Sequence, residues 1–120
     1  MNTLIFYIDR HSVWRPQDWI VSLGGGNVFN NQFTLEFDGE LISVIPSAQV
    51  LCELEEEELI RLHEIVAEPN AFIVEWRGDG LIEKFIESIP NTTSVAVDND
   101  HGLIVSVHDV RGMPLNSWIH

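Results

Sequence analysis

The sequence predicts a single α+β domain, built as a mixed or antiparallel sheet of five to six strands with about three helices packed mainly on one face. Segments with strand-like and helix-like spacing of apolar residues intermingle along the chain without strict alternation, as in such layered folds. The chain has 120 residues, near the commonest size of one domain, and 45% of them are hydrophobic, enough for a packed core. No linker-like stretch divides it, so we expect residues 1–120 to fold as one domain.

The N-terminal part of the chain predicts a strand followed by a short helix. Residues 3–9 are mostly β-branched or aromatic, which favours a strand buried on at least one face. Pro16 suits the first position of a helix, and apolar side chains follow it at helical spacing. The run Gly24-Gly25-Gly26-Asn27 is expected to end this helix and to form a mobile connection.

A β-hairpin is predicted next. Apolar side chains alternate over residues 32–37, and Asp38-Gly39 follows, a dipeptide typical of two-residue hairpin turns. The return strand is expected over residues 40–45, where Pro46 stops it.

The second half of the chain predicts two helices and three strands. Apolar side chains at helical spacing predict the longest helix over residues 53–68 and another helix that begins at Asp79 or Gly80. Short apolar runs predict strands over residues 71–76, 94–97 and 103–107. The tail from residue 110 to residue 120 contains Gly112 and Pro114 and predicts irregular packing.

The chain is strongly acidic. Nineteen Asp and Glu face six Lys and Arg, which gives a formal net charge of −13. A domain of that charge repels polyanions and attracts cations over a Debye length of about 8–10 Å. Nucleic acid and anionic membranes are therefore excluded as expected partners, and a basic protein is favoured. The charge also has a plain structural interpretation, because net charge keeps a domain soluble.

Cysteine usage and hydropathy indicate a cytoplasmic protein. Cys52 is the one cysteine, so no internal disulfide framework exists, as expected in a reducing compartment. Residues 1–9 are apolar but short, and no basic region precedes them, which differs from a secretory signal. No run approaches the ~18 apolar residues of a membrane span.

Four consecutive glutamates, Glu55 to Glu58, are the first candidate site. They lie at the start of the predicted helix, where the helix dipole stabilises anions by about 0.3–1 kcal/mol each. This position explains them structurally. The functional interpretation is an acidic surface that meets a basic partner, with Glu55 and Glu56 as candidate contacts.

The second candidate is the turn Asp98-Asn99-Asp100-His101-Gly102. Two carboxylates beside an imidazole suggest a cation, but calcium loops need more ligands and zinc sites need three or four spaced His or Cys ligands. Asx and Gly residues are ordinary turn chemistry, so we expect no metal and no cofactor. Asp98 and Asp100 remain candidates for contact with a partner, because loops on a rigid sheet often carry binding residues.

Trp14 is the third candidate. The chain has four tryptophans, and Trp14 and Trp118 lie in predicted loops or tails, where an aromatic side chain can anchor an interface. The alternative is that both tryptophans cap the edge of the core.

No catalytic motif is present in the sequence. None of the serines lies in a Gly-x-Ser-x-Gly elbow, and Cys52 precedes an acidic helix, whose negative charge disfavours a nucleophilic thiolate. The glycines 24–26 follow a helix without a nearby lysine, unlike a phosphate-binding loop. We therefore expect a protein that is not an enzyme.

The chain combines a small, acidic α+β domain, a lone cysteine and an acidic turn, residues 98–102, before an apolar strand. In these features it resembles the immunity proteins of bacterial contact-dependent growth inhibition and related polymorphic-toxin systems. The resemblance is one of type and rests on no diagnostic motif. It implies tight non-covalent neutralisation of one cognate toxin domain, often a nuclease. The implied partner is a basic toxin domain.

Two alternatives from other classes remain open. The first is a small metal-dependent hydrolase that uses His101, His108, Asp98 and Asp109. The second is a self-associating regulatory subunit, assembled through an exposed sheet edge or the tail around Trp118. The chain is accordingly expected to be a monomer or a homodimer.

Overall fold

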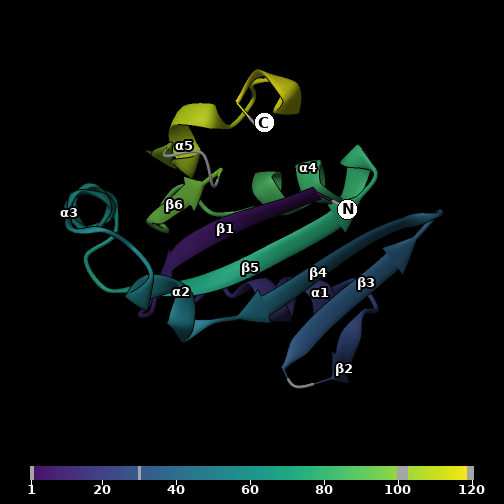
Figure 1. The fold of residues 1–120 in the computed structure, drawn as a ribbon. Coiled ribbons are helices and arrows are strands. Elements are labelled where there is room, and N and C mark those ends of the chain that lie inside the picture. The colour runs from purple at the N-terminus through teal and green to yellow at the C-terminus, as the bar shows by residue number, and fades with distance from the viewer. Residues whose placement is uncertain (1, 30, 100–102, 119–120) are drawn as a thin grey trace.

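One continuous sheet organises the molecule (Figure 1). The computed structural model describes residues 2–29, 31–99 and 103–118. Its seven strands are β1 Asn2–Asp9, β2 Gly26–Phe29, β3 Gln32–Phe37, β4 Glu40–Pro46, β5 Pro69–Arg77, β6 Val95–Asp98 and β7 Ile104–Ser106. They lie in the order β2-β3-β4-β5-β1-β6-β7, and every neighbouring pair is antiparallel. The predicted α+β class is confirmed, with more strands than the five to six expected.

Within the described residues, five helices and one 3-10 turn pack on this sheet. They are α1 Pro16–Ser22, α2 Ala48–Cys52, α3 Glu56–Ile65, α4 Asp79–Ser88, α5 Val107–Val110 and the 3-10 turn η1 Leu115–Ser117. None of these helices has the length and apolar character needed to cross a bilayer.

The first strand of the chain occupies the interior of the sheet. β1 pairs with β5 on one side and with β6 on the other, with Phe6 opposite Phe72 and Val97. Covered on both faces over most of its length, β1 is apolar almost throughout, which explains the unbroken apolar run at residues 4–8.

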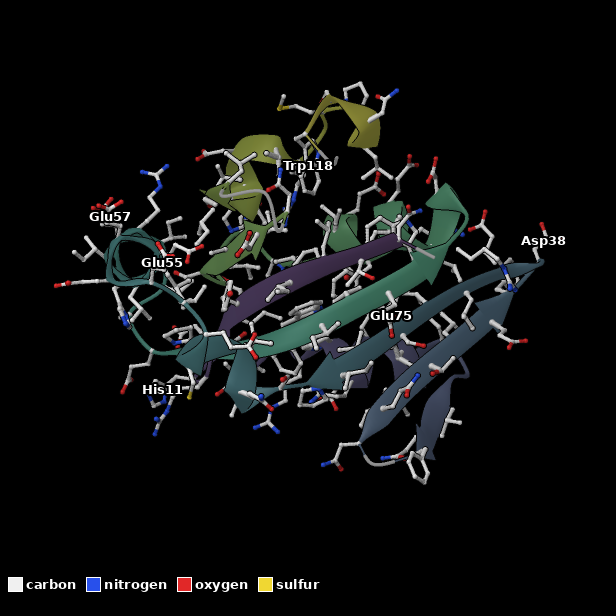
Figure 2. All side chains as sticks on the ribbon, viewed as in Figure 1. His11, Asp38, Glu55, Glu57, Glu75 and Trp118 are labelled. Carbon is white, nitrogen blue, oxygen red and sulfur yellow. The ribbon has the colours of Figure 1, made fainter. Side chains whose placement is uncertain are left out.

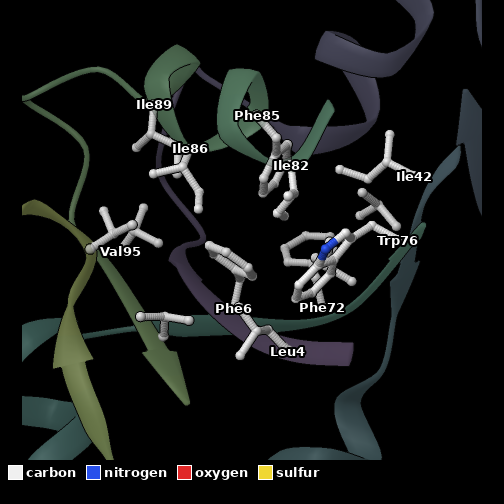
Figure 3. Close-up of a cluster of buried hydrophobic side chains, with 14 of the residues drawn as sticks. Leu4, Phe6, Ile42, Phe72, Trp76, Ile82, Phe85, Ile86, Ile89 and Val95 are labelled. Atoms are coloured by element: carbon white, nitrogen blue, oxygen red, sulfur yellow. The ribbon is translucent and has the colours of Figure 1, made fainter. Parts of the chain in front are cut away.

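The main core lies between one face of the sheet and α1, α4 and α5. Figure 3 shows Ile82, Phe85 and Ile86 of α4 directed at Phe6 and Trp76 of the sheet. The rings of Phe6 and Phe85 meet edge to face with centroids 5.2 Å apart, a favourable aromatic geometry.

A smaller apolar cluster lies on the opposite face, beneath α3. Leu62 and Val66 pack there against Tyr7, Ala96 and Ile104 from three neighbouring strands, and both are fully buried. The helices thus cover mainly one face, as predicted, while α2 and α3 cover part of the other.

The predicted hairpin is present. Phe37 pairs with Glu40, and the two turn residues Asp38 and Gly39 both have positive φ, 53° and 79°. Two consecutive positive φ values suit the right-handed twist of the flanking strands.

Two predictions about the elements were wrong. The glycine-rich stretch expected to be only a connection supplies Gly26 at the start of β2. The helix expected over residues 53–68 is the shorter α3, which begins at Glu56 because Glu55 adopts an extended backbone with φ −74° and ψ 163°. The separate helix α2, at Ala48–Cys52, was not predicted. α3 ends at Ile65 because Val66 is also extended, at φ −130° and ψ 117°, and buries its side chain.

Candidate functional site

The start of α3 holds the four glutamates in two structural roles. Glu55 is the N-cap residue, and its side chain faces the backbone N–H of Glu58 in a capping box. In return, the backbone N–H of Glu55 donates to Oε1 of Glu58 at 2.9 Å. Two of the four carboxylates therefore satisfy backbone groups that the first helical turn leaves open.

The other two glutamates, Glu56 and Glu57, are exposed. Among the described residues, neither has a hydrogen bond or ion pair, whereas Glu64 lies 3.7 Å from Arg61 in the last turns of the same helix. Figure 2 shows Glu57 pointing away from the sheet, with Glu55 beside it. The structure therefore leaves Glu56 and Glu57 as carboxylates that face solvent. We call the exposed side of α3 with Glu55, Glu56, Glu57 and Glu64 the acidic surface.

Asp98 is not part of this surface. It is the last residue of β6, opposite Ile5 of β1 and Ile104 of β7, and only 4% of it is exposed. The sequence suggested a turn residue open to a partner, but the strand continues through position 98 and places it inside the sheet. Asp100 and His101 lie outside the described residues.

Trp14 packs at the edge of the main core. Its ring centroid lies 5.7 Å from that of Phe85, and Trp19 meets the same phenylalanine edge to face at 5.4 Å. The loop holds its position because Oγ of Ser12 donates to the backbone carbonyl of Trp14 at 2.8 Å. This half-buried position fits the structural alternative for Trp14 better than the interface anchor. Trp118 is also buried, at 5% exposure.

The three histidines in the described part of the chain are used in separate structural contacts. The ring of His11 is paired with Glu68, and Nδ1 of His63 contacts the carbonyl oxygen of Ala67 at 3.2 Å. Nε2 of His108 contacts the carbonyl oxygen of Thr93 at 2.8 Å, so this nitrogen carries the proton and donates it. Within residues 2–29, 31–99 and 103–118, no three His, Cys, Asp or Glu side chains are grouped to hold a metal ion.

A cavity of about 510 Å³ brings Asp9, His11 and Ser12 together beside Thr93. The hydroxyl of Ser12 is bonded to the carbonyl of Trp14 and lies 3.3 Å from Oγ1 of Thr93, while the His11 ring is paired with Glu68. The serine and the histidine are therefore directed to other groups, unlike a nucleophile and its base. The described residues of the metal-dependent hydrolase alternative, His108, Asp98 and Asp109, do not line this cavity.

A smaller cavity of about 180 Å³ lies next to the loop between β1 and α1, and Arg10 and Arg15 are among its lining residues. Apart from Trp14, no residue of this loop was predicted from the sequence to have a function. The signal that was available is the presence of two of the six Lys and Arg within six residues.

Comparisons with models of protein families, with curated proteins and with solved structures find no match for this chain. The class that the fold defines is a single α+β domain with a continuous antiparallel sheet.

Proposed function

We propose that this chain is a cytoplasmic immunity protein that binds and neutralises a basic toxin domain, with a nuclease as the favoured target. The observation that supports this proposal is the acidic surface, where Glu56 and Glu57 face solvent without a partner among the described residues. The helix dipole also stabilises these two carboxylates in the first turn, but unlike Glu55 and Glu58 they make no contact with the backbone of the described residues, so both are available to a partner.

Charge explains how such a surface would act. A nuclease must hold a polyanion, so the cleft that binds its substrate is basic. An acidic surface is steered into that cleft, and association can reach about 10⁸–10⁹ M⁻¹s⁻¹ at low salt. Rapid capture suits an inhibitor whose target damages the cell that contains it.

The proposed contact residues are fewer than those suggested by the sequence. Glu56 and Glu57 are proposed as contacts, and Glu55 contributes its charge from the cap position. Asp98 and Trp14 are left out because both are held within the fold. Asp100 stays a prediction from the sequence.

The test begins with the partner. The tagged full-length chain is used for affinity capture from its native cells at low and at moderate salt, followed by mass spectrometry. We expect one stoichiometric basic protein that stays bound at moderate salt and whose toxic activity is abolished by the complex. Purified chain that captures no such protein would contradict the proposal.

Kinetics with that partner then test the acidic surface. We expect the double variant Glu56→Gln/Glu57→Gln to associate roughly tenfold more slowly and with a flatter salt dependence, because steering depends on local charge. The matched control is Glu83→Gln/Glu87→Gln on α4, which removes the same charge from an exposed helix on the opposite face of the sheet. Equal slowing in the two double variants would show that net charge, and not α3, drives association.

A further inference from the structure

One edge of this acidic molecule carries no charge. Between Asp18 and Glu36 the sequence contains no Asp, Glu, Lys or Arg, although charged residues make up 21% of the whole chain. This segment forms most of α1, all of β2 and most of β3. β2 is the outermost strand of the sheet on that side (Figure 1).

The same edge exposes apolar side chains. Four of the nine large hydrophobic residues that the described structure exposes lie here, namely Val21 at 53%, Leu23 at 51%, Val28 at 68% and Phe29 at 69%. The other five are spread over separate elements. We call these four residues, with the outer side of β2, the neutral edge. Clustered exposed apolar residues mark interaction sites.

The outer side of β2 presents backbone N–H and C=O groups that can pair with another strand. β2 pairs with β3 on one side only, and no other strand of the described chain lies beyond it. Proteins usually protect such an edge with lysine, proline or a bulge. β2 has a register shift between Asn27 and Phe29, but it has no charged residue and no proline.

We propose that the neutral edge binds a second copy of this chain, through antiparallel pairing of β2 with β2 of that copy. A strand paired antiparallel with itself gives a two-fold interface, in which each copy contributes the same residues. Val28 and Phe29 of the two copies are then buried together.

The charge distribution favours a second copy of this chain as the molecule that binds the neutral edge. Two molecules of net charge −13 repel, and contact through the acidic surface would place carboxylates opposite carboxylates. The neutral edge avoids this repulsion. A basic partner is instead attracted to carboxylates, and this segment has none.

The dimer leaves the acidic surface accessible. α3 packs over β6 and β7, at the far end of the strand order from β2. Each copy would therefore present its own acidic surface at the outer end of a sheet that continues across both copies. The inference is independent of the proposed function, because it requires only the purified chain.

Sedimentation equilibrium on the full chain tests the dimer at about 0.01 M and about 0.15 M NaCl, where the Debye length is ~30 Å and ~8 Å. We expect a monomer–dimer equilibrium in which added salt strengthens association, because salt screens the repulsion between two acidic copies. Binding of a basic partner has the opposite salt dependence. A monomer at every concentration and salt, or a dimer that salt weakens, would overturn the proposal.

Val28→Lys locates the interface, with Val13→Lys as the matched control. Val13 is 97% exposed and lies outside the neutral edge, so both variants add one positive charge at an exposed position. We expect Val28→Lys to raise the dimer dissociation constant about tenfold or more, and Val13→Lys to leave it near the original value. Circular dichroism checks that both variants are folded. A dimer that Val28→Lys does not weaken would place the interface elsewhere and refute the proposal.

Discussion

Glu40 shows how one carboxylate can stabilise a helix to which it does not belong. It is the first residue of β4, and its Oε1 accepts the backbone N–H of Leu81 in the first turn of α4 at 2.8 Å. The N-cap of α4 is Gly78, which has no side chain to do this. A Cβ on Gly78 would lie 2.7 Å from Cγ of Glu40, so glycine leaves the space that the glutamate occupies.

We expect Glu40→Ala to lower the free energy of unfolding by about 1 kcal/mol, because it removes a charged cap from the N-terminal end of α4. Urea denaturation followed by circular dichroism measures this loss. Glu36→Ala is the control, since Glu36 is an exposed acidic residue on the adjoining strand and its side chain has no hydrogen bond among the described residues. Its effect should stay within about 0.5 kcal/mol. Equal losses in both variants would mean that Glu40 acts through strand β4 instead of α4.

At the residue scale, local sequence indicated the exposure of Glu56, because the run of glutamates predicted the start of a helix. Contact of Glu55 and Glu56 with a partner stays a prediction. Asp98 is buried because β6 extends one residue further than predicted and lies between two other strands. Trp14 is held by Phe85, which is about seventy positions away along the chain. Contacts of that kind have no signal in local spacing.

At the scale of elements, the sequence correctly predicted the strands and helices whose apolar residues follow a clear strand or helix periodicity. The strands around residues 3–9 and 32–45 and the helix after Asp79 have strong alternation or a strong helical stripe, and all are present. β2 was missed because glycine favours loops, yet β3 offers it a pairing partner. The start of α3 was placed three residues too early because glutamates have good helix propensity, so nothing in the composition marks the extended backbone of Glu55. The five-residue helix α2 was missed because it is too short to show a helical period.

The two faces of α3 give a second prediction. Leu62 is fully buried against strands β1, β6 and β7, whereas Ile60, two residues earlier on the same helix, is 56% exposed. We expect Leu62→Ala to lower the free energy of unfolding by about 2–5 kcal/mol, because it leaves a cavity in the smaller core. Ile60→Ala should cost much less. Urea denaturation of both variants measures the difference, and similar losses would show that α3 is not docked by its Leu62 face.

At the scale of the whole molecule, the strand order lay beyond sequence reasoning. The central pairing joins β1 to β5, segments more than sixty residues apart, and no local pattern specifies that choice. The strand order also places groups of acidic residues far apart in the molecule. Asp38 and the glutamates of α3 lie at opposite ends of the molecule (Figure 2), whose longest dimension is 39 Å. That is several Debye lengths at physiological salt, which is about 8 Å, so carboxylates repel mainly their own neighbours.

This distribution predicts how salt changes the stability of the fold. Nineteen acidic residues outnumber six basic ones, and one pair of a basic and an acidic side chain among them, Arg61 with Glu64, is present in the described residues. Repulsion in the compact state should therefore exceed attraction. We expect the free energy of unfolding in urea to rise between about 0.01 M and about 0.15 M NaCl. The same rise in the Val28→Lys variant would separate screening within one molecule from dimer formation. A fall in stability with added salt would mean that attractive pairs dominate the electrostatics of the fold.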